Sequence, residues 1–145
     1  MFSEMPDPTY WNVDKMTYND HEWALLPETF ETDITLNDLF MPLATSTDPN
    51  TGTKFVAAME GRGDNPFFAT QFHPEKPATI YNNTGISHSW AAVQYSRYFA
   101  DYFIEMTREN MNTCGKSWDE CQDMIIENTP VTVTKDHRGN VYAFD

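Results

Sequence analysis

The stretch Gln71-Phe72-His73-Pro74-Glu75-Lys76-Pro77 holds the side chains best suited to chemistry. His73 follows an apolar run typical of a strand, Pro74 stops the strand ladder, and Glu75 stands two residues beyond the histidine. Such a carboxylate is close enough to orient the imidazole, and α/β folds gather ligand sites at the carboxyl ends of strands. An oriented histidine is half of a nucleophile–base–orienter arrangement. The alternative is a loop histidine that makes one backbone hydrogen bond.

Short strands are expected to position this stretch. The run Phe67–Phe72 is mostly apolar, which favours a strand buried on both faces, as in a layered α/β sheet. Upstream, Leu43–Asp48 and Lys54–Met59 flank Asp48-Pro49-Asn50-Thr51-Gly52, whose Pro, Asn and Gly supply the fixed and positive φ values of a turn. We therefore expect a β-hairpin there. Before the hairpin, Thr35 is expected to cap a short helix.

The strongest periodic segment of the sequence begins at Ser89. Apolar residues recur there at steps of three and four and form one wide stripe: Val93, Tyr95, Tyr98, Phe99, Tyr102, Phe103 and Met106. Charged and polar residues occupy much of the other face. The pattern predicts a helix over Trp90–Asn110 that packs on the sheet, and an aromatic stripe of this kind favours core packing over a cofactor box.

Residues 111–145 are expected to form a peripheral tail. The segment Cys114–Asn128 is polar and predicts no definite element. Val131–Thr134 and Val141–Phe144 flank a turn at Asp136–Asn140, which is typical of a hairpin. The tail therefore predicts a small terminal hairpin.

Composition indicates an acidic globular chain. Its 145 residues, of which 40% are hydrophobic and 14% aromatic, suffice for one domain with a buried core. Nine Lys and Arg against 22 Asp and Glu give a net charge of −13, which argues against a nucleic-acid partner or an anionic membrane surface. No apolar run reaches the roughly 20 residues of a membrane span, and residues 1–8 show no signal peptide. No spacing suggests zinc ligands, so we expect neither metal nor cofactor.

Several segments, taken together, are similar to a known family. Phe68–Lys76, with its His-Pro-Glu, resembles a segment of the class I glutamine amidotransferase-like enzymes. Further matches, in the right order, are specific to one branch, the γ-glutamyl hydrolases: Asn19-Asp20-His21-Glu22-Trp23, Met59-Glu60-Gly61 and Gly85-Ile86-Ser87-His88. The ending Tyr142-Ala143-Phe144-Asp145 is also similar to the family's aromatic–aspartate ending. The resemblance covers most of residues 19–110.

The resemblance implies an α/β fold, namely the C-terminal part of a flavodoxin-like class I glutamine amidotransferase domain, with a mixed sheet and a long helix packed on it. It also implies a cysteine hydrolase that cleaves γ-glutamyl bonds, such as those of folylpoly-γ-glutamates. His73 falls on the catalytic histidine of the family, Glu75 on its acidic partner, and His21 on a second active-site histidine. The alternative for His21 is a surface histidine beside Trp23.

The family's nucleophile has no counterpart in this sequence. That cysteine lies in a Gly-x-Cys-x-Gly elbow upstream of the histidine, whereas Cys114 and Cys121 both follow His73 and lack the strand-then-turn context of an elbow. We therefore expect residues 1–145 to form a single partial domain that resembles the C-terminal half of the family domain. Such a chain would be inactive alone.

Two hypotheses about function follow from this departure. In the first, the chain supplies the His/Glu half of a γ-glutamyl hydrolase whose N-terminal half carries the nucleophile. Lys76 and Arg62, together with Lys54, are then the candidates for binding an anionic γ-glutamyl substrate. In the second, the chain is an inactive relative retained as a structural or interaction subunit, because half a doubly wound domain leaves a sheet edge and a helix face for partner proteins to cover.

The remaining motifs concern the cellular compartment. Cys114 and Cys121 are seven positions apart, so they are either a small-loop disulfide of a secreted protein or two free thiols. Asn82-Asn83-Thr84 is a sequon, which makes Asn82 a candidate N-glycosylation site in a secretory compartment. The family resemblance implies a vacuolar, lysosomal or secreted protein.

Overall fold

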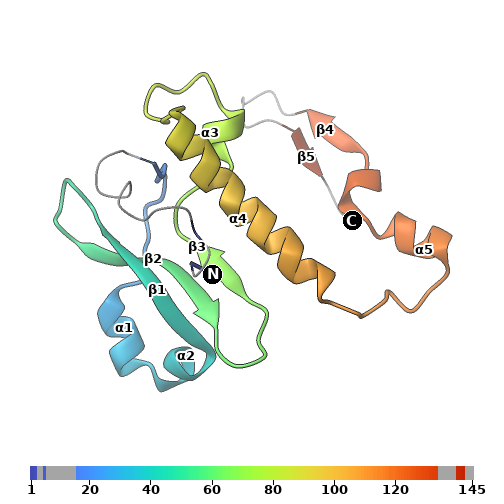
Figure 1. Ribbon diagram of the computed structural model, residues 1–145, viewed down its shortest axis with the longest axis horizontal. Coiled ribbons are helices and arrows are strands. Elements are labelled where there is room, and N and C mark those ends of the chain that lie inside the picture. Colours follow the sequence, from blue (N-terminus) through green and yellow to red (C-terminus); the bar gives the residue numbers. More distant parts are fainter. Residues whose placement is uncertain (3–4, 6–15, 134–139, 143–145) are drawn as a thin grey trace. The chain divides into compact units, whose positions relative to one another are not determined.

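The computed structural model describes residues 1–2, 5, 16–133 and 140–142 and divides into two compact units, Met1–Glu109 and Asn110–Asp145 (Figure 1). The first unit holds a three-stranded sheet and the longest helix, and the second holds a short helix and two short strands. The architecture is therefore mixed α/β with small antiparallel sheets. The mixed sheet expected from the resemblance is not found in the described part of the chain.

The predicted hairpin is confirmed. Strands β1 (Phe40–Thr47) and β2 (Lys54–Gly61) pair in antiparallel fashion around a turn in which Gly52 has a φ of +73°. The Asp48 carboxylate accepts the Asn50 N–H at 2.8 Å and the Thr51 hydroxyl at 2.9 Å. These two hydrogen bonds lower the pKa of Asp48. The turn is thus fixed by its own side chains.

Strand β3 (Phe68–Thr70) corrects the prediction for Phe67–Phe72. It has three residues, pairs antiparallel with β2, and is half-buried, not buried on both faces. The sheet order is β1-β2-β3, so the central and most buried strand is β2, through Phe55–Ala58. The short connection between β2 and β3 is the reason for the antiparallel pairing, because a parallel pair needs a crossover of a dozen or more residues.

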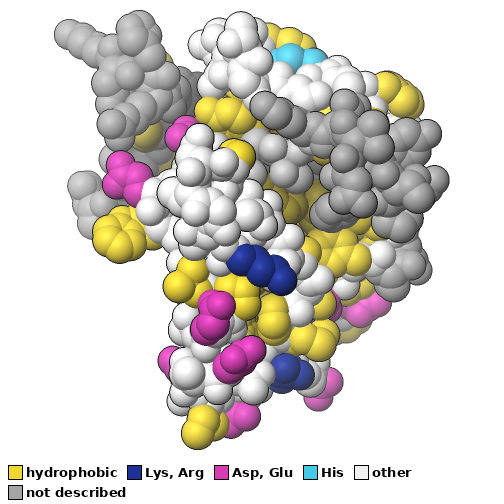
Figure 2. All heavy atoms as spheres, turned by 90° about the vertical axis from the view of Figure 1, so that its left-hand side faces the viewer, with side chains coloured by type: hydrophobic (Ala, Val, Ile, Leu, Met, Phe, Trp, Pro, Cys, Tyr) yellow, Lys and Arg dark blue, Asp and Glu magenta, His cyan; other side chains and the backbone are white. Residues whose placement is uncertain are grey.

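Two short helices precede the hairpin, α1 (Pro27–Thr32) and α2 (Ile34–Leu39). The helix cap expected at Thr35 is wrong, because the Asp33 carboxylate accepts the Leu36 N–H at 3.0 Å and so begins α2 two residues earlier. Figure 2 shows the molecule from the left-hand side of Figure 1. Hydrophobic and acidic side chains are intermixed over the lower part of that view, where α1 and α2 lie.

The long helix α4 (Trp90–Arg108) begins as predicted at Ser89, whose hydroxyl accepts the Ala92 N–H at 3.2 Å. Its stripe packs on the sheet, as expected. The rings of Phe99 and Tyr102 meet those of Phe72 and Phe68, each pair with centroids 5.2 Å apart. Towards the start of the helix, Ala92 and Tyr95 are buried together with Met16.

The predicted stripe includes one aromatic residue, Phe103, that does not pack on the sheet. Phe103 lies on the same helical face as Phe99, yet 56% of it is exposed. The aromatic contacts between the sheet and α4 end at Tyr102, which meets Phe68 at the start of the short strand β3. Periodicity gives the direction of a helical face but carries no information on how far the facing sheet extends.

Replacing Ser89 by alanine is expected to destabilise the first unit. The substitution removes the acceptor of the Ala92 N–H, and loss of a helix N-cap costs about 1 kcal/mol in the free energy of unfolding. Urea denaturation followed by circular dichroism measures this change. Thr107→Ala removes a hydroxyl from the other end of the same helix and is the control. An equal or larger loss in Thr107→Ala would contradict the assignment of the cap.

The second unit contains α5 (Trp118–Asp123), a 3₁₀ turn at Ile126–Asn128, and the antiparallel pair β4 (Val131–Val133) and β5 (Asn140–Tyr142). The two short strands of the predicted terminal hairpin are therefore present, while its expected turn lies mostly outside the described residues. Over the described ranges, no helix combines the length and the apolar character that a membrane span requires.

Candidate active site

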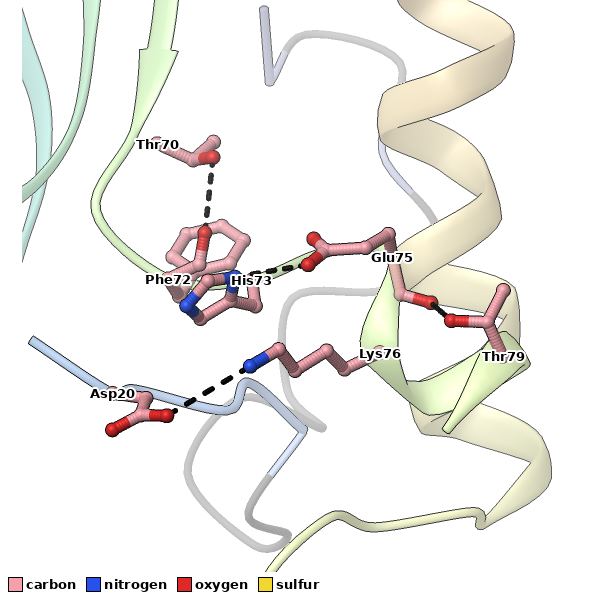
Figure 3. Close-up of polar contacts among 7 residues, drawn as sticks. All are labelled: Asp20, Thr70, Phe72, His73, Glu75, Lys76 and Thr79. Carbon is pink, nitrogen blue, oxygen red and sulfur yellow. Dashed lines mark hydrogen bonds and ion pairs between the residues drawn. The ribbon is translucent and has the colours of Figure 1, made fainter. Parts of the chain in front are cut away.

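His73 and Glu75 lie in the turn between β3 and α3 (Lys76–Thr79), as Figure 3 shows. Beyond β3 the chain bends at Gln71 and Phe72, and the His73 N–H then donates to the Tyr18 carbonyl at 2.8 Å in an isolated bridge. The Phe72 side chain is buried against Phe99 of α4. Phe72 is therefore anchored in the core, while the side chain of the neighbouring His73 stays partly exposed.

The prediction that the His73 and Glu75 side chains lie within contact distance of each other is confirmed. Nδ1 of the imidazole lies 2.9 Å from Oε1 of the carboxylate, as the dashed line in Figure 3 marks. An ionised carboxylate can only accept, so the neutral imidazole carries its proton on Nδ1 and keeps a lone pair on Nε2. The two side chains are 36% and 58% exposed, which leaves them open to a reactant. The pair is therefore chemically equipped to act as a general base with its orienting group.

Lys76 is the cation beside this pair. It begins α3, and its ammonium lies 3.9 Å from Oδ2 of Asp20 and 4.9 Å from the centre of the Tyr18 ring. Figure 3 shows Lys76 and Asp20 pointing toward one another below the imidazole. Lys76 is thus placed near the site, although Asp20 neutralises part of its charge.

The Arg62 side chain makes its contacts away from His73 and Glu75, with residues of α2 and β1. Its Nε donates to the carbonyls of Asn37 at 2.6 Å and Phe40 at 3.0 Å, and its terminal nitrogen donates to Oδ1 of Asn37 at 3.1 Å. The guanidinium therefore ties the end of β2 to α2 and to the start of β1. These contacts give Arg62 a structural role, and it is not part of the site proposed below.

His21 lies on the segment that pairs with His73 but makes other contacts. Its ring meets Phe55 edge-on with centroids 5.2 Å apart, Nδ1 lies 3.1 Å from the Trp23 carbonyl oxygen, and Nε2 lies 3.3 Å from Oδ1 of Asn19. With Phe55 and Phe72 it lines a hollow of about 1150 Å³ next to the site. Its role as a second active-site histidine stays a prediction.

Tyr18 contacts His73 but was not among the predicted site residues. This residue forms the isolated bridge with His73 and lies under the Lys76 ammonium. The signal that could have drawn attention to it is its position directly before Asn19–Trp23, a segment already marked by the resemblance. Nothing in the local pattern indicates that it contacts a residue 55 positions later.

The two cysteines are joined by a disulfide, which links Cys114 to Cys121 in α5. Neither sulfur is therefore available as a thiolate. Asn82 is exposed in the loop between α3 and α4, in a position open to modification. Among the described residues, no group of three His, Cys, Asp or Glu side chains could hold a metal ion.

The sequence of the chain is similar to those of several known proteins. The chain is 32% identical to the γ-glutamyl hydrolases of Mus musculus and Homo sapiens, and the matches cover 91% of it. This chain is a relative of the γ-glutamyl hydrolases. A third such relative, γ-glutamyl hydrolase B of Dictyostelium discoideum, is 29% identical over 91% of the chain. No protein-family model matches the sequence.

The match covers only part of each γ-glutamyl hydrolase. The chain spans 39% of the length of the Mus musculus and Homo sapiens proteins and 38% of the Dictyostelium discoideum protein. This coverage agrees with the predicted relationship to the C-terminal half of the family domain.

Proposed function

We propose that this chain supplies a general base and its orienting carboxylate to a cysteine-dependent γ-glutamyl hydrolase. The observation that carries the proposal is the 2.9 Å hydrogen bond between His73 and Glu75, in a chain whose relatives are γ-glutamyl hydrolases. We further propose that the first unit belongs to the C-terminal part of a flavodoxin-like class I glutamine amidotransferase domain. The long helix α4 packed on the sheet behind His73 supports this assignment.

The proposed reaction passes through an acyl-enzyme. A cysteine thiolate attacks the γ-carbonyl carbon of the amide, and backbone N–H groups near the nucleophile hold the oxyanion. Protonated Nε2 of His73 gives its proton to the leaving amine as the C–N bond breaks. Neutral Nε2 then takes a proton from water, which attacks the thioester and releases the thiolate and the γ-carboxylic acid, and this acid loses its proton to solvent. Glu75 holds the imidazole throughout and stabilises its charged form.

The nucleophile in this proposal comes from outside residues 1–145. Cys114 and Cys121 bond to each other, and attack on a carbonyl requires a free thiolate. A separate N-terminal half with a Gly-x-Cys-x-Gly elbow would supply that thiolate. It would also cover apolar side chains that the first unit leaves exposed, among them Trp23, Ile34 and Phe67, which are 86%, 76% and 59% exposed.

The proposed substrates are γ-linked glutamates of the folylpolyglutamate type, which are anions. Attraction to a chain of net charge −13 has to come from a local cation. Lys76 is the candidate, because it is the cation placed next to His73 and Glu75. A substrate carboxylate would take the position beside the ammonium that Asp20 now holds.

The second candidate function is non-enzymatic. The disulfide between the two cysteines favours it, because it leaves residues 1–145 without a cysteine thiolate of their own. In this case the chain is a structural or interaction subunit, and unrelated proteins cover the exposed apolar side chains. The identity of the companion chain separates the two candidates.

We also propose a vacuolar, lysosomal or secreted location. Two features of the chain support it: the disulfide, which persists in oxidising compartments, and the exposed Asn82 in its sequon. A glycan mass on the peptide that contains Asn82 would be the matching observation.

The native protein that contains this chain tests the enzymatic proposal. We expect it to carry additional polypeptide and to cleave a p-aminobenzoyl peptide with γ-linked glutamates but not the α-linked peptide. Iodoacetamide should stop the cleavage and label a cysteine outside residues 1–145, because the sulfurs of this chain are bonded to each other. Mass spectrometry of the labelled peptides gives the position.

Two results of the same experiments would contradict the enzymatic proposal or the disulfide. Unrelated companion proteins, with no cleavage of the γ-linked peptide, would favour the structural subunit. Labelling of Cys114 or Cys121 without prior reduction would contradict the disulfide and place a candidate thiol inside this chain.

A further inference from the structure

Tyr18 contacts His73 with both its backbone and its ring. Its carbonyl accepts the His73 N–H at 2.8 Å, and its ring centroid lies 6.1 Å from the imidazole centroid with the planes tilted by 44°. The Lys76 ammonium lies 4.9 Å from the centre of the same ring. One residue thus links the segment before α1 to the β3–α3 turn and to the first residue of α3.

The Tyr18 hydroxyl is held by the loop that precedes α4. Nδ2 of Asn83 donates to this hydroxyl at 3.0 Å, while Oδ1 of Asn83 accepts the Gly85 N–H at 2.8 Å. The second bond turns the amide so that its NH₂ group faces the ring. A Cβ at Gly85 would lie 3.6 Å from Cε2 of Tyr18, so the loop packs closely against the ring. The ring is therefore fixed at its edge, at its hydroxyl and by its backbone.

We propose that Tyr18 is a positioning residue for the His73 imidazole. The bond to Glu75 fixes one ring nitrogen, but a single hydrogen bond leaves the imidazole free to tilt about it. The Tyr18 carbonyl fixes the backbone from which His73 projects, and the tilted phenol ring limits the tilt of the imidazole. The effect on catalysis rests on the proposed function, whereas the effect on the imidazole does not.

Replacing Tyr18 by leucine tests this assignment in the native protein. The substitution keeps the backbone bond and removes the ring and its hydroxyl. Nitrogen-15 shifts of the His73 ring report the ratio of the Nδ1–H to the Nε2–H tautomer. We expect that ratio to fall by about fivefold, which corresponds to the loss of one aromatic contact. In the hydrolysis assay, kcat should fall by up to about a hundredfold with little change in KM.

Two further variants separate positioning from general stability. Tyr18→Phe keeps the ring and loses only the bond to Asn83, so we expect a smaller change in the tautomer ratio. Tyr81→Leu is the matched control, because Tyr81 stacks on a different histidine, His88, with centroids 4.4 Å apart. It should alter the ring shifts of His88 and leave those of His73 unchanged.

An unchanged tautomer ratio of His73 in Tyr18→Leu would overturn the inference. An equal change in Tyr81→Leu would also overturn it, because the effect would then follow stability and not position. Where Tyr18→Leu does not fold, the ratio in Tyr18→Phe decides. A changed ratio in a native protein that does not hydrolyse γ-glutamyl peptides would leave the positioning role standing and remove the proposed function.

Discussion

Residues 1–145 prepared alone are expected to release no glutamate from a γ-linked peptide. A histidine general base accelerates a reaction by about 10²–10⁴, but only where a group is present for it to activate. The remaining members of a catalytic triad contribute little once the nucleophile is missing. Co-expression with an N-terminal half that carries a Gly-x-Cys-x-Gly elbow should restore hydrolysis. Chromatographic quantification of released glutamate measures both preparations.

Solubility provides the control for this experiment. The chain alone should be poorly soluble or partly unfolded, because it exposes large apolar side chains such as Trp23 and Ile34. A companion whose elbow cysteine is replaced by serine should restore solubility without hydrolysis. Robust hydrolysis by the isolated chain would contradict the proposal and would make Cys114 and Cys121 the candidates for the nucleophile.

His73→Ala in the complemented protein is expected to lower kcat by about 10²–10⁴. The variant removes the group that protonates the leaving amine and deprotonates water. Glu75→Gln should cause a smaller loss, because an amide keeps the size of the side chain but not the charge that stabilises an imidazolium. Steady-state kinetics on the γ-linked peptide gives kcat and KM for each variant.

Glu105→Gln is the matched control for the carboxylate. Glu105 pairs with Arg108 on the exposed face of α4, so its replacement should leave kcat unchanged. His21→Ala should lower kcat less than His73→Ala, because His21 contacts Phe55 and the Trp23 carbonyl, not Glu75. A retained kcat in His73→Ala would show that the histidine is not the base.

Local patterns predicted the elements that depend on neighbouring residues. The turn at residues 48–52 and the cap at Ser89 are short-range hydrogen-bond motifs, and both occur as expected. The His73–Glu75 bond belongs to the same class, because it joins residues two positions apart. Helix α5 was not predicted, although its own sequence carries a signal for it. Ser117 and Glu120 form a capping box, which is a short-range motif that marks the start of a helix.

Other features depend on distant parts of the chain and had no local signal. The burial of β3 is set by its place beside β2, and the exposure of Phe103 by the end of the aromatic contacts under α4. The role of Arg62 depends on carbonyl groups 22 and 25 residues earlier in the sequence. Side-chain type alone identifies a cation at such a position but not the acceptor it meets.

The bridge between Tyr18 and His73 also leads us to expect a definite order in which the site assembles during folding. The His73–Glu75 bond closes over two residues and can form as soon as the turn exists. The Tyr18 contact has to close a loop of about 55 residues, and such loop closure costs more entropy and is formed later. We therefore expect the imidazole and its carboxylate to meet before tertiary structure is complete, and a defined ring orientation to arrive with the last long-range contacts.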